Sequence, residues 1–73
     1  MKSIRERYPG PWIIEEARES MIVRTRCGRQ VAQIFAEDME TRRHLLGHMT
    51  WAEARAIARA IAGLADSPLD RPD

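Results

Sequence analysis

Two runs of β-favouring residues, 21–26 and 30–36, bracket the dipeptide Cys27–Gly28, and they constrain the fold of this chain more than any other feature. Such runs on either side of a short glycine-containing loop are typical of a β-hairpin. A tight loop centred on the dipeptide predicts four cross-strand pairs, namely Arg26–Arg29, Thr25–Gln30, Val23–Ala32 and Met21–Ile34. Because side chains alternate between the two faces of a strand, this register sorts the hairpin residues into two sets.

The two faces predicted by this register differ in character. The inner face is apolar throughout and is expected to pack on the core: Met21, Val23, Ala32, Ile34 and Ala36. The outer face mixes basic, polar and apolar groups: Ile22, Arg24, Arg26, Arg29, Val31, Gln33 and Phe35. That one register yields a wholly apolar face is independent support for it.

A helix is predicted after the hairpin. Thr50 and Glu53 have the spacing of a capping box, in which each side chain accepts a hydrogen bond from the other residue's backbone amide. Apolar residues then recur at the spacing of one helix face: Trp51, Ala54, Ile57, Ala58, Ile61, Leu64 and Ala65. Gly63 is expected to mark the end of this helix, because glycine is unfavourable in a helix interior.

These elements predict an α+β fold in the order β-β-β-α, a three-stranded antiparallel sheet packed against one C-terminal helix. Residues 12–17 supply the first strand. The predicted core consists of Trp12, Ile14, Met21, Val23, Ala32, Ile34, Trp51, Ala54, Ile57, Ala58 and Ile61. Many of these residues are alanines, so the core is expected to be thin.

The chain is expected to form a single α+β domain over residues 11–65. Residues 1–10 are polar and unpatterned at their start, and we expect a flexible N-terminus. Residues 66–73 are rich in proline and aspartate, which predicts a disordered tail. Residues 39–49 fit either a loop or one helical turn that Gly47 ends.

Length and composition exclude several classes of protein. A chain of 73 residues with no apolar run near the ~18 residues of a membrane span predicts no membrane partner. A chain this small buries only about 60% of its unfolded surface, so we expect no deep pocket, no small-molecule substrate and no enzymatic activity. The single cysteine, Cys27, rules out an internal disulfide and predicts a cytoplasmic location.

Two patterns resemble reactive or metal-binding sites. His44 and His48 have a helical metal-ligand spacing, but no third ligand follows at a diagnostic distance, and both are interpreted as ordinary loop histidines. Cys27 lies between Arg26 and Arg29, which favours its thiolate, yet without a pocket it is interpreted as a turn residue. The sequence therefore predicts no catalytic residue, no metal site and no cofactor.

The outer sheet face is the best functional candidate, and two interpretations of it stay open. Exposed Ile22, Val31 and Phe35 predict a protein interface, covered by pairing of sheet faces or edge strands into a homodimer or by another protein. Residues 18–36 carry a net charge of +3, and the alternative is nucleic-acid binding by this face. The residues expected to contact nucleic acid are Arg24, Arg26, Arg29 and Gln33. Protein interaction is the preferred prediction.

The chain also resembles a group of short alphaproteobacterial proteins for which no activity is known. The residues that carry this resemblance are Pro11–Trp12, Glu15–Glu16, Val23–Arg24, Gly28–Arg29, Ala32, Phe35, Glu37–Asp38, Arg42–Arg43, Thr50, Glu53–Ala54–Arg55, Ile57–Ala58 and Ile61–Ala62. They span residues 11–65, and the group would be expected to have Asn–Gly where this chain has Cys27–Gly28. The resemblance implies a bacterial cytoplasmic protein and supplies no functional residues.

Overall fold

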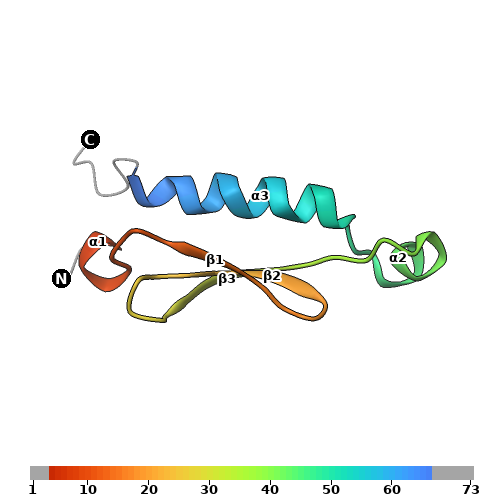
Figure 1. Ribbon diagram of the computed structural model, residues 1–73, viewed down its shortest axis with the longest axis horizontal. Coiled ribbons are helices and arrows are strands. Elements are labelled where there is room, and N and C mark those ends of the chain that lie inside the picture. Colours follow the sequence, from red (N-terminus) through yellow and green to blue (C-terminus); the bar gives the residue numbers. More distant parts are fainter. Residues whose placement is uncertain (1–3, 67–73) are drawn as a thin grey trace.

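The computed structural model describes residues 4–66, which form an α+β fold with a three-stranded antiparallel sheet and helices (Figure 1). Its elements, in chain order, are α1 (Ile4–Arg7), β1 (Ile13–Glu16), β2 (Ser20–Arg24), β3 (Gln30–Phe35), α2 (Glu40–Leu46), α3 (Trp51–Gly63) and the 3-10 helix η1 (Leu64–Asp66). The sheet forms one layer, α3 forms the second, and α2 lies at the far end (Figure 1). The predicted β-β-β-α core is confirmed. No helix within residues 4–66 is long and apolar enough to cross a membrane.

The sheet has the strand order β1-β2-β3, and its inner register is the predicted one, with Val23 opposite Ala32 and Met21 opposite Ile34. Near the hairpin loop the prediction is wrong, because Gln30 lies opposite Arg24 and not Thr25. A register shift at this point leaves one extra residue, Val31, in β3, which is the form of a β-bulge. The bulge therefore changes the facing of every residue between Val31 and the loop.

The hairpin loop explains this shift. The Gly28 amide donates to the Thr25 carbonyl (2.9 Å), and the Thr25 amide donates to the Arg29 carbonyl (2.8 Å). Arg29 is therefore hydrogen-bonded to Thr25. The predicted pairing of Arg29 with Arg26 is wrong. Gly28 has φ 91°, a left-handed conformation that glycine adopts without steric cost. A turn followed by a left-handed residue is a common hairpin connection.

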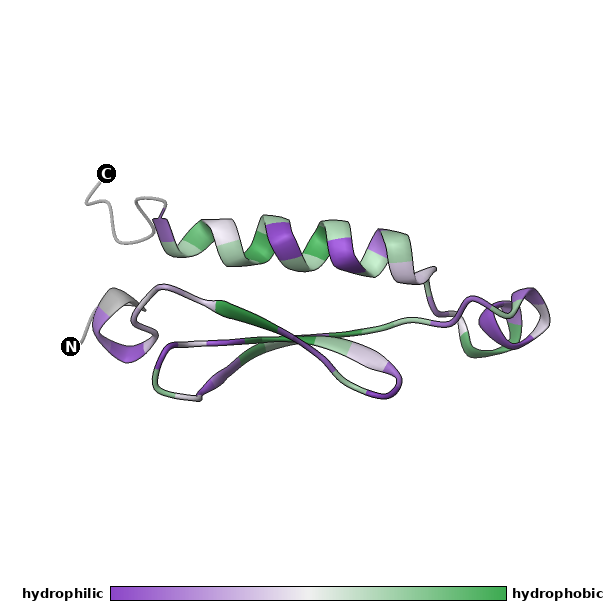
Figure 2. Ribbon diagram, viewed as in Figure 1, coloured by the Kyte–Doolittle hydropathy of each residue, from purple (hydrophilic) through white to green (hydrophobic). Residues whose placement is uncertain are grey.

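The inner sheet face and α3 enclose the core. Six side chains make up the buried cluster: Met21, Val23, Ile34, Ala36, Ala54 and Ala58. Figure 2 shows apolar residues along both β2 and α3. The two alanines let α3 approach the sheet closely, and Trp12, Ile14, Trp51 and Ile61 pack around the cluster partly buried.

Ile57 was predicted to lie in the core, and this prediction is wrong. Its side chain is 41% exposed, whereas Ala54 and Ala58 are fully buried. Successive residues of a helix are about 100° apart, so Ile57 lies to one side of the line that faces the sheet. A single helix over a narrow sheet covers less than its whole apolar stripe.

The start of α3 is fixed by three polar side chains. The predicted capping box is present: Thr50 Oγ1 accepts from the Glu53 amide (3.1 Å), and Glu53 Oε1 accepts from the Thr50 amide (2.9 Å). Asp38 Oδ1 accepts from the Trp51 amide at 2.9 Å. The hydrogen bonds that Glu53 accepts, first from the Thr50 amide and second from the Thr50 hydroxyl (3.0 Å), lower the pKa of its carboxyl. At its other end the α-helix stops at Gly63, as predicted.

The interval left open by the sequence contains a helix. Residues 37–48 leave the body between Ala36 and Met49, which form a parallel bridge, and carry α2 (Figure 1). Gly47 ends α2 with φ 69° and donates its amide to the Arg43 carbonyl. No residue of α2 is buried. Residues 37–48 therefore project from the body as one segment whose two ends are held together by the Ala36–Met49 bridge.

The N-terminal segment packs on the body earlier than the expected boundary at residue 11. The Tyr8 carbonyl accepts from Trp12 Nε1 (2.9 Å), and the Pro9 carbonyl accepts from the Arg26 amide (3.4 Å). Gly10 lies against Ala65. Residues 8–10 therefore join the hairpin loop to η1, which directly follows α3. Most of the predicted tail, residues 67–73, lies outside the described residues.

Candidate interaction surfaces

The predicted outer apolar patch does not form. Ile22 points to the outer face of β2, yet it is only 7% exposed. Its cross-strand neighbours are Glu15 on β1 and Gln33 on β3, and their side chains flank it on both sides. Ile22 is therefore a buried residue of the central strand, and the prediction that it forms part of a protein interface is wrong.

Val31 and Phe35, the other two residues of the predicted patch, do not lie together on the outer face either. Val31 is the extra residue of the bulge and packs against the core cluster, so its predicted place on the outer face is wrong. Phe35 is exposed at the end of β3, as predicted, and its ring stacks on His48 with 5.4 Å between centroids. The sequence did not predict this contact, because the two residues come from different elements.

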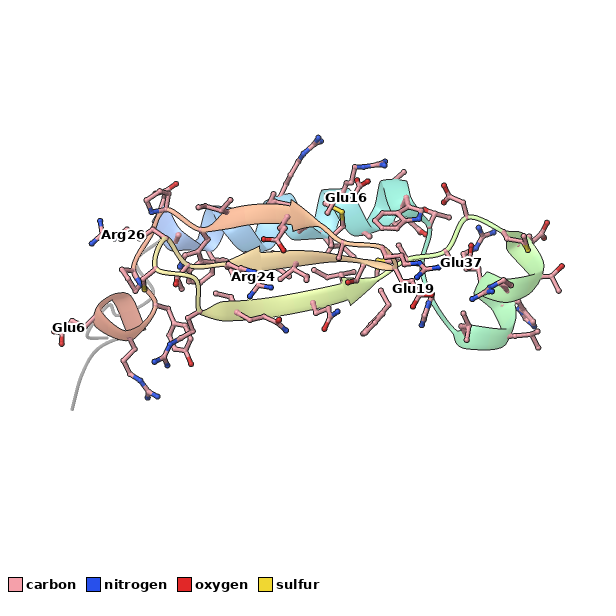
Figure 3. The ribbon with its side chains drawn as sticks, turned by 60° about the horizontal axis from the view of Figure 1, so that its bottom comes forward. Glu6, Glu16, Glu19, Arg24, Arg26 and Glu37 are labelled. Carbon is pink, nitrogen blue, oxygen red and sulfur yellow. The ribbon has the colours of Figure 1, made fainter. Side chains whose placement is uncertain are left out.

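Two of the predicted nucleic-acid contacts are used within the sheet. Arg24 projects from the sheet (Figure 3). Its Nε lies 3.4 Å from Glu15 Oε2 on β1, and its Nη1 lies 3.5 Å from the Gly28 carbonyl. Gln33 Nε2 donates to the buried Ser20 Oγ at 2.9 Å. Both side chains lie on the predicted outer face, but each already has partners there.

The other two predicted contacts gather with residues that sequence analysis did not select. The Arg29 guanidinium lies over the Tyr8 ring at 5.2 Å from its centroid, and that of Arg7 lies at 5.9 Å. Arg26 is exposed at the same end, where its amide meets Pro9. We call Arg7, Arg26 and Arg29 the arginine cluster. The only sequence signal for it was an aromatic residue among basic ones.

An apolar surface lies along α3 and the start of η1, and the sequence placed two of its three residues, Ile57 and Ile61, in the core. Ile57, Ile61 and Leu64 follow one another at i, i+4 and i+7 spacing, and we call them the α3 flank. Ile57 and Leu64 are 41% and 43% exposed. Arg55 is on the other side of α3 from Ile57, and its Nη2 lies 3.7 Å from Glu16 Oε1 on β1. The side of α3 that carries Arg55 therefore lies over β1. The α3 flank therefore lies above β3.

The strand beneath this flank is an edge strand. Among residues 4–66, β3 pairs only with β2, and its six residues, QVAQIF, include no charged residue and no proline. Unpaired backbone groups on an uncharged edge are a template for another strand. The α3 flank and the β3 edge are adjacent parts of one side of the molecule.

The remaining polar groups include the cysteine and the two histidines that the sequence singled out, Cys27, His44 and His48. Within residues 4–66, no three His, Cys, Asp or Glu side chains come together as a metal site requires. Cys27 is exposed, and its Sγ lies 3.3 Å from Thr25 Oγ1. A hollow of about 670 Å³ opens beside α2 and is lined by Glu40, Thr41, Arg43, His44, Leu45, Gly47 and His48.

Comparison of the chain with protein-family models, with curated proteins and with solved structures found no match. The resemblance to small alphaproteobacterial proteins therefore stays a prediction.

Proposed function

We propose that this protein is a non-enzymatic interaction module that pairs with a second copy of itself through the β3 edge and the α3 flank. The observation that carries the proposal is that Ile57 and Leu64 of the α3 flank are exposed above β3, an uncharged edge strand whose outer side is unpaired among the described residues. Antiparallel pairing of two β3 strands would give a six-stranded sheet with the two α3 helices side by side. We place the module in the cytoplasm because its one cysteine is exposed and free.

The two edges of the sheet differ in a way that favours β3. β1 is only four residues long and carries the exposed Glu15 and Glu16. Pro11 lies two residues before its first residue, Ile13. Charges, proline and short length are the usual protections of an edge strand against pairing. β3 has none of these three, and the protection that it does have is the bulge at Val31. The pairing edge is therefore β3.

The expected strength of the dimer follows from the exposed side chains. Complete burial of an Ile or Leu side chain contributes about 1.5–3 kcal/mol, and roughly two fifths of each remains to be buried for Ile57 and Leu64. A two-fold interface counts each residue twice. This apolar contribution of about 2.4–4.8 kcal/mol does not by itself offset the about 4–15 kcal/mol that association costs. The dimer therefore also depends on the backbone hydrogen bonds between the two β3 strands, and we expect it to be weak, with a Kd in the micromolar to millimolar range.

Sedimentation equilibrium from about 10 µM to 1 mM protein, the range set by this affinity, tests the proposal. The wild type is expected to shift from monomer to dimer across the series. Ile57→Lys places a charge on the α3 flank, and Gln33→Lys places like charges close together across the paired edges. Both variants are expected to stay monomeric.

Ala56→Lys is the matched control, because Ala56 is exposed on the side of α3 turned away from the sheet and neighbours Ile57 in sequence. It is expected to dimerise as the wild type does. A wild type that stays monomeric at about 1 mM would refute the proposal, since that concentration is the upper end of the expected range. Dimerisation that Ile57→Lys and Gln33→Lys leave intact would refute the assigned surface.

A further inference from the structure

We infer that the arginine cluster at the β2–β3 hairpin loop binds the phosphodiester backbone of a nucleic acid. The cluster is built from two chain segments that are distant in sequence. α1 and the residues after it supply Arg7 and Tyr8, and the loop supplies Arg26 and Arg29. The backbone bond between the Arg26 amide and the Pro9 carbonyl joins the two segments (3.4 Å).

The stacking of Arg29 on Tyr8 prepares this guanidinium for phosphate. A guanidinium that lies over a ring contacts it with its flat face, so the N–H donors along its edge stay available. Those donors match two oxygens of one phosphate in a bidentate pair. The ring also restricts the side chain before a ligand arrives, which reduces the entropy lost on binding. Arg7 lies over the same ring at 5.9 Å.

The charge at this end favours an anion. Arg24 also reaches the loop, but Glu15 balances its charge, so it is not counted. Glu6 of α1 is an acidic group at the same end, where Figure 3 shows it on a different segment from Arg26, and Asp66 follows Ala65, which lies against Gly10. Among residues 4–66, the three cationic groups of the cluster thus outnumber the two acidic groups at this end, Glu6 and Asp66.

A nucleic acid fits this arrangement better than one small anion. The cluster presents separate guanidiniums from two segments and not a closed cradle of backbone amides. Such spaced cations suit a chain of phosphates, which each contact neutralises with release of a counterion. The edge of β3 and the α3 flank take no part, so this inference stands or falls independently of dimerisation.

The test is a fluorescence-anisotropy titration of the full chain with a labelled duplex of about 12 base pairs in increasing salt. Three phosphate contacts predict a log–log salt slope of about −2.7, or about 40-fold weaker binding at 200 mM than at 50 mM salt. Arg26→Ala is expected to bring the slope to about −1.8. Arg18→Ala is the matched control, because Arg18 is exposed in the turn at the other end of β2.

A second pair of variants tests the ring. Tyr8→Phe keeps the stacking surface and is expected to bind as the wild type does, whereas Tyr8→Ala releases Arg29 and is expected to weaken binding. Thermal melts of both variants separate a loss of affinity from a loss of fold. Amide NMR shifts are expected at residues 7–8 and 25–29 when the duplex is added.

Three results would overturn the inference. The first is the absence of shifts in these two segments at low salt. The second is an equal effect of Arg18→Ala and Arg26→Ala, which would show unspecific attraction to net charge. The third is saturation of the same shifts by inorganic phosphate with no tighter binding of the duplex, which would identify a small-anion site.

Discussion

Two buried residues, Val23 on β2 and Thr25 at the start of the following loop, provide a test of the fold. Valine and threonine have nearly the same shape, so exchanging one for the other changes polarity alone. Val23 is fully buried on β2 between the sheet and α3, and Thr25 is 1% exposed at the start of the loop. Val23→Thr introduces a hydroxyl where the surroundings are apolar. Thr25→Val removes a hydroxyl whose oxygen accepts from the Arg29 amide at 3.1 Å.

Both exchanges are expected to destabilise the fold, for opposite reasons. An unpaired hydroxyl in the core costs about 1–3 kcal/mol, and we expect about 2 kcal/mol for Val23→Thr. Loss of the acceptor for the Arg29 amide costs about 1 kcal/mol, because water can reach the exposed loop and bond to that amide. Urea unfolding followed by circular dichroism measures both. With a slope near 1 kcal/mol per molar urea, the midpoint falls by about 2 M and about 1 M.

Either value can contradict the reasoning. If Val23→Thr leaves the midpoint unchanged, the space between β2 and α3 is wet and the described core is wrong. If Thr25→Val is neutral, the bonds of the loop do not hold the bulge in place.

Three further predictions concern single contacts. Stability is expected to decrease as pH falls below about 4.5, the unfolded pKa of Glu53, towards its lower folded pKa, because the carboxylate that bonds to Thr50 is then protonated; Glu53→Gln should remove this component in melts across the pH range. Gly10→Ala is expected to cost about 1 kcal/mol by overpacking, since a Cβ there would lie 3.1 Å from the Ala65 Cβ, and Ala65→Gly in the same chain should restore the urea midpoint. Gly47→Ala is expected to destabilise the fold by about 1–2 kcal/mol, because Gly47 has φ 69°. Gly63→Ala is expected to stabilise it by about 0.5–1 kcal/mol, because Gly63 is helical and a Cβ there would meet open space. Equal effects of the two variants on the melting temperature would contradict the assigned ends of α2 and α3.

The sequence predicted those parts of the fold that depend on local periodicity. Alternation along 21–26 and 30–36 gave the inner face, and the Thr50–Glu53 spacing gave the start of α3. The prediction from periodicity failed near the hairpin loop, where one extra residue in β3 shifts the alternation of side chains between the two sheet faces. The bulge at Val31 turns the strand, and no pattern in an isolated sequence marks which position of a β-strand will be left unpaired.

The candidate site was less predictable than the fold, because it depends on contacts between distant segments. An apolar repeat shows which side of a helix faces inward but not how wide the layer beneath it is, and so Ile57 was placed in the core. Outward alternation likewise does not show that Glu15 and Gln33 flank Ile22. Arg29 was selected as a basic residue, but its position over Tyr8 follows from the packing of residues 8–10 on the loop.

The two proposals together constrain how a nucleic acid could be held. In an antiparallel β3–β3 pair, the hairpin loops lie at opposite ends of the paired strands. The six residues of β3 measure about 20 Å at ~3.4 Å per residue, so the two arginine clusters are at least that far apart. With ~3.4 Å per base pair, about six base pairs span the distance. At protein concentrations that favour the dimer, a duplex of about 12 base pairs can therefore engage both clusters, and its salt slope is expected to steepen from the about −2.7 of one cluster towards about −5.4. Linkage of the two sites is also expected to raise its affinity well beyond that of a duplex of about four base pairs. Gln33→Lys should abolish this length dependence while leaving the binding of the short duplex unchanged. Length dependence that persists in a monomeric Gln33→Lys variant would show that one chain carries both contacts.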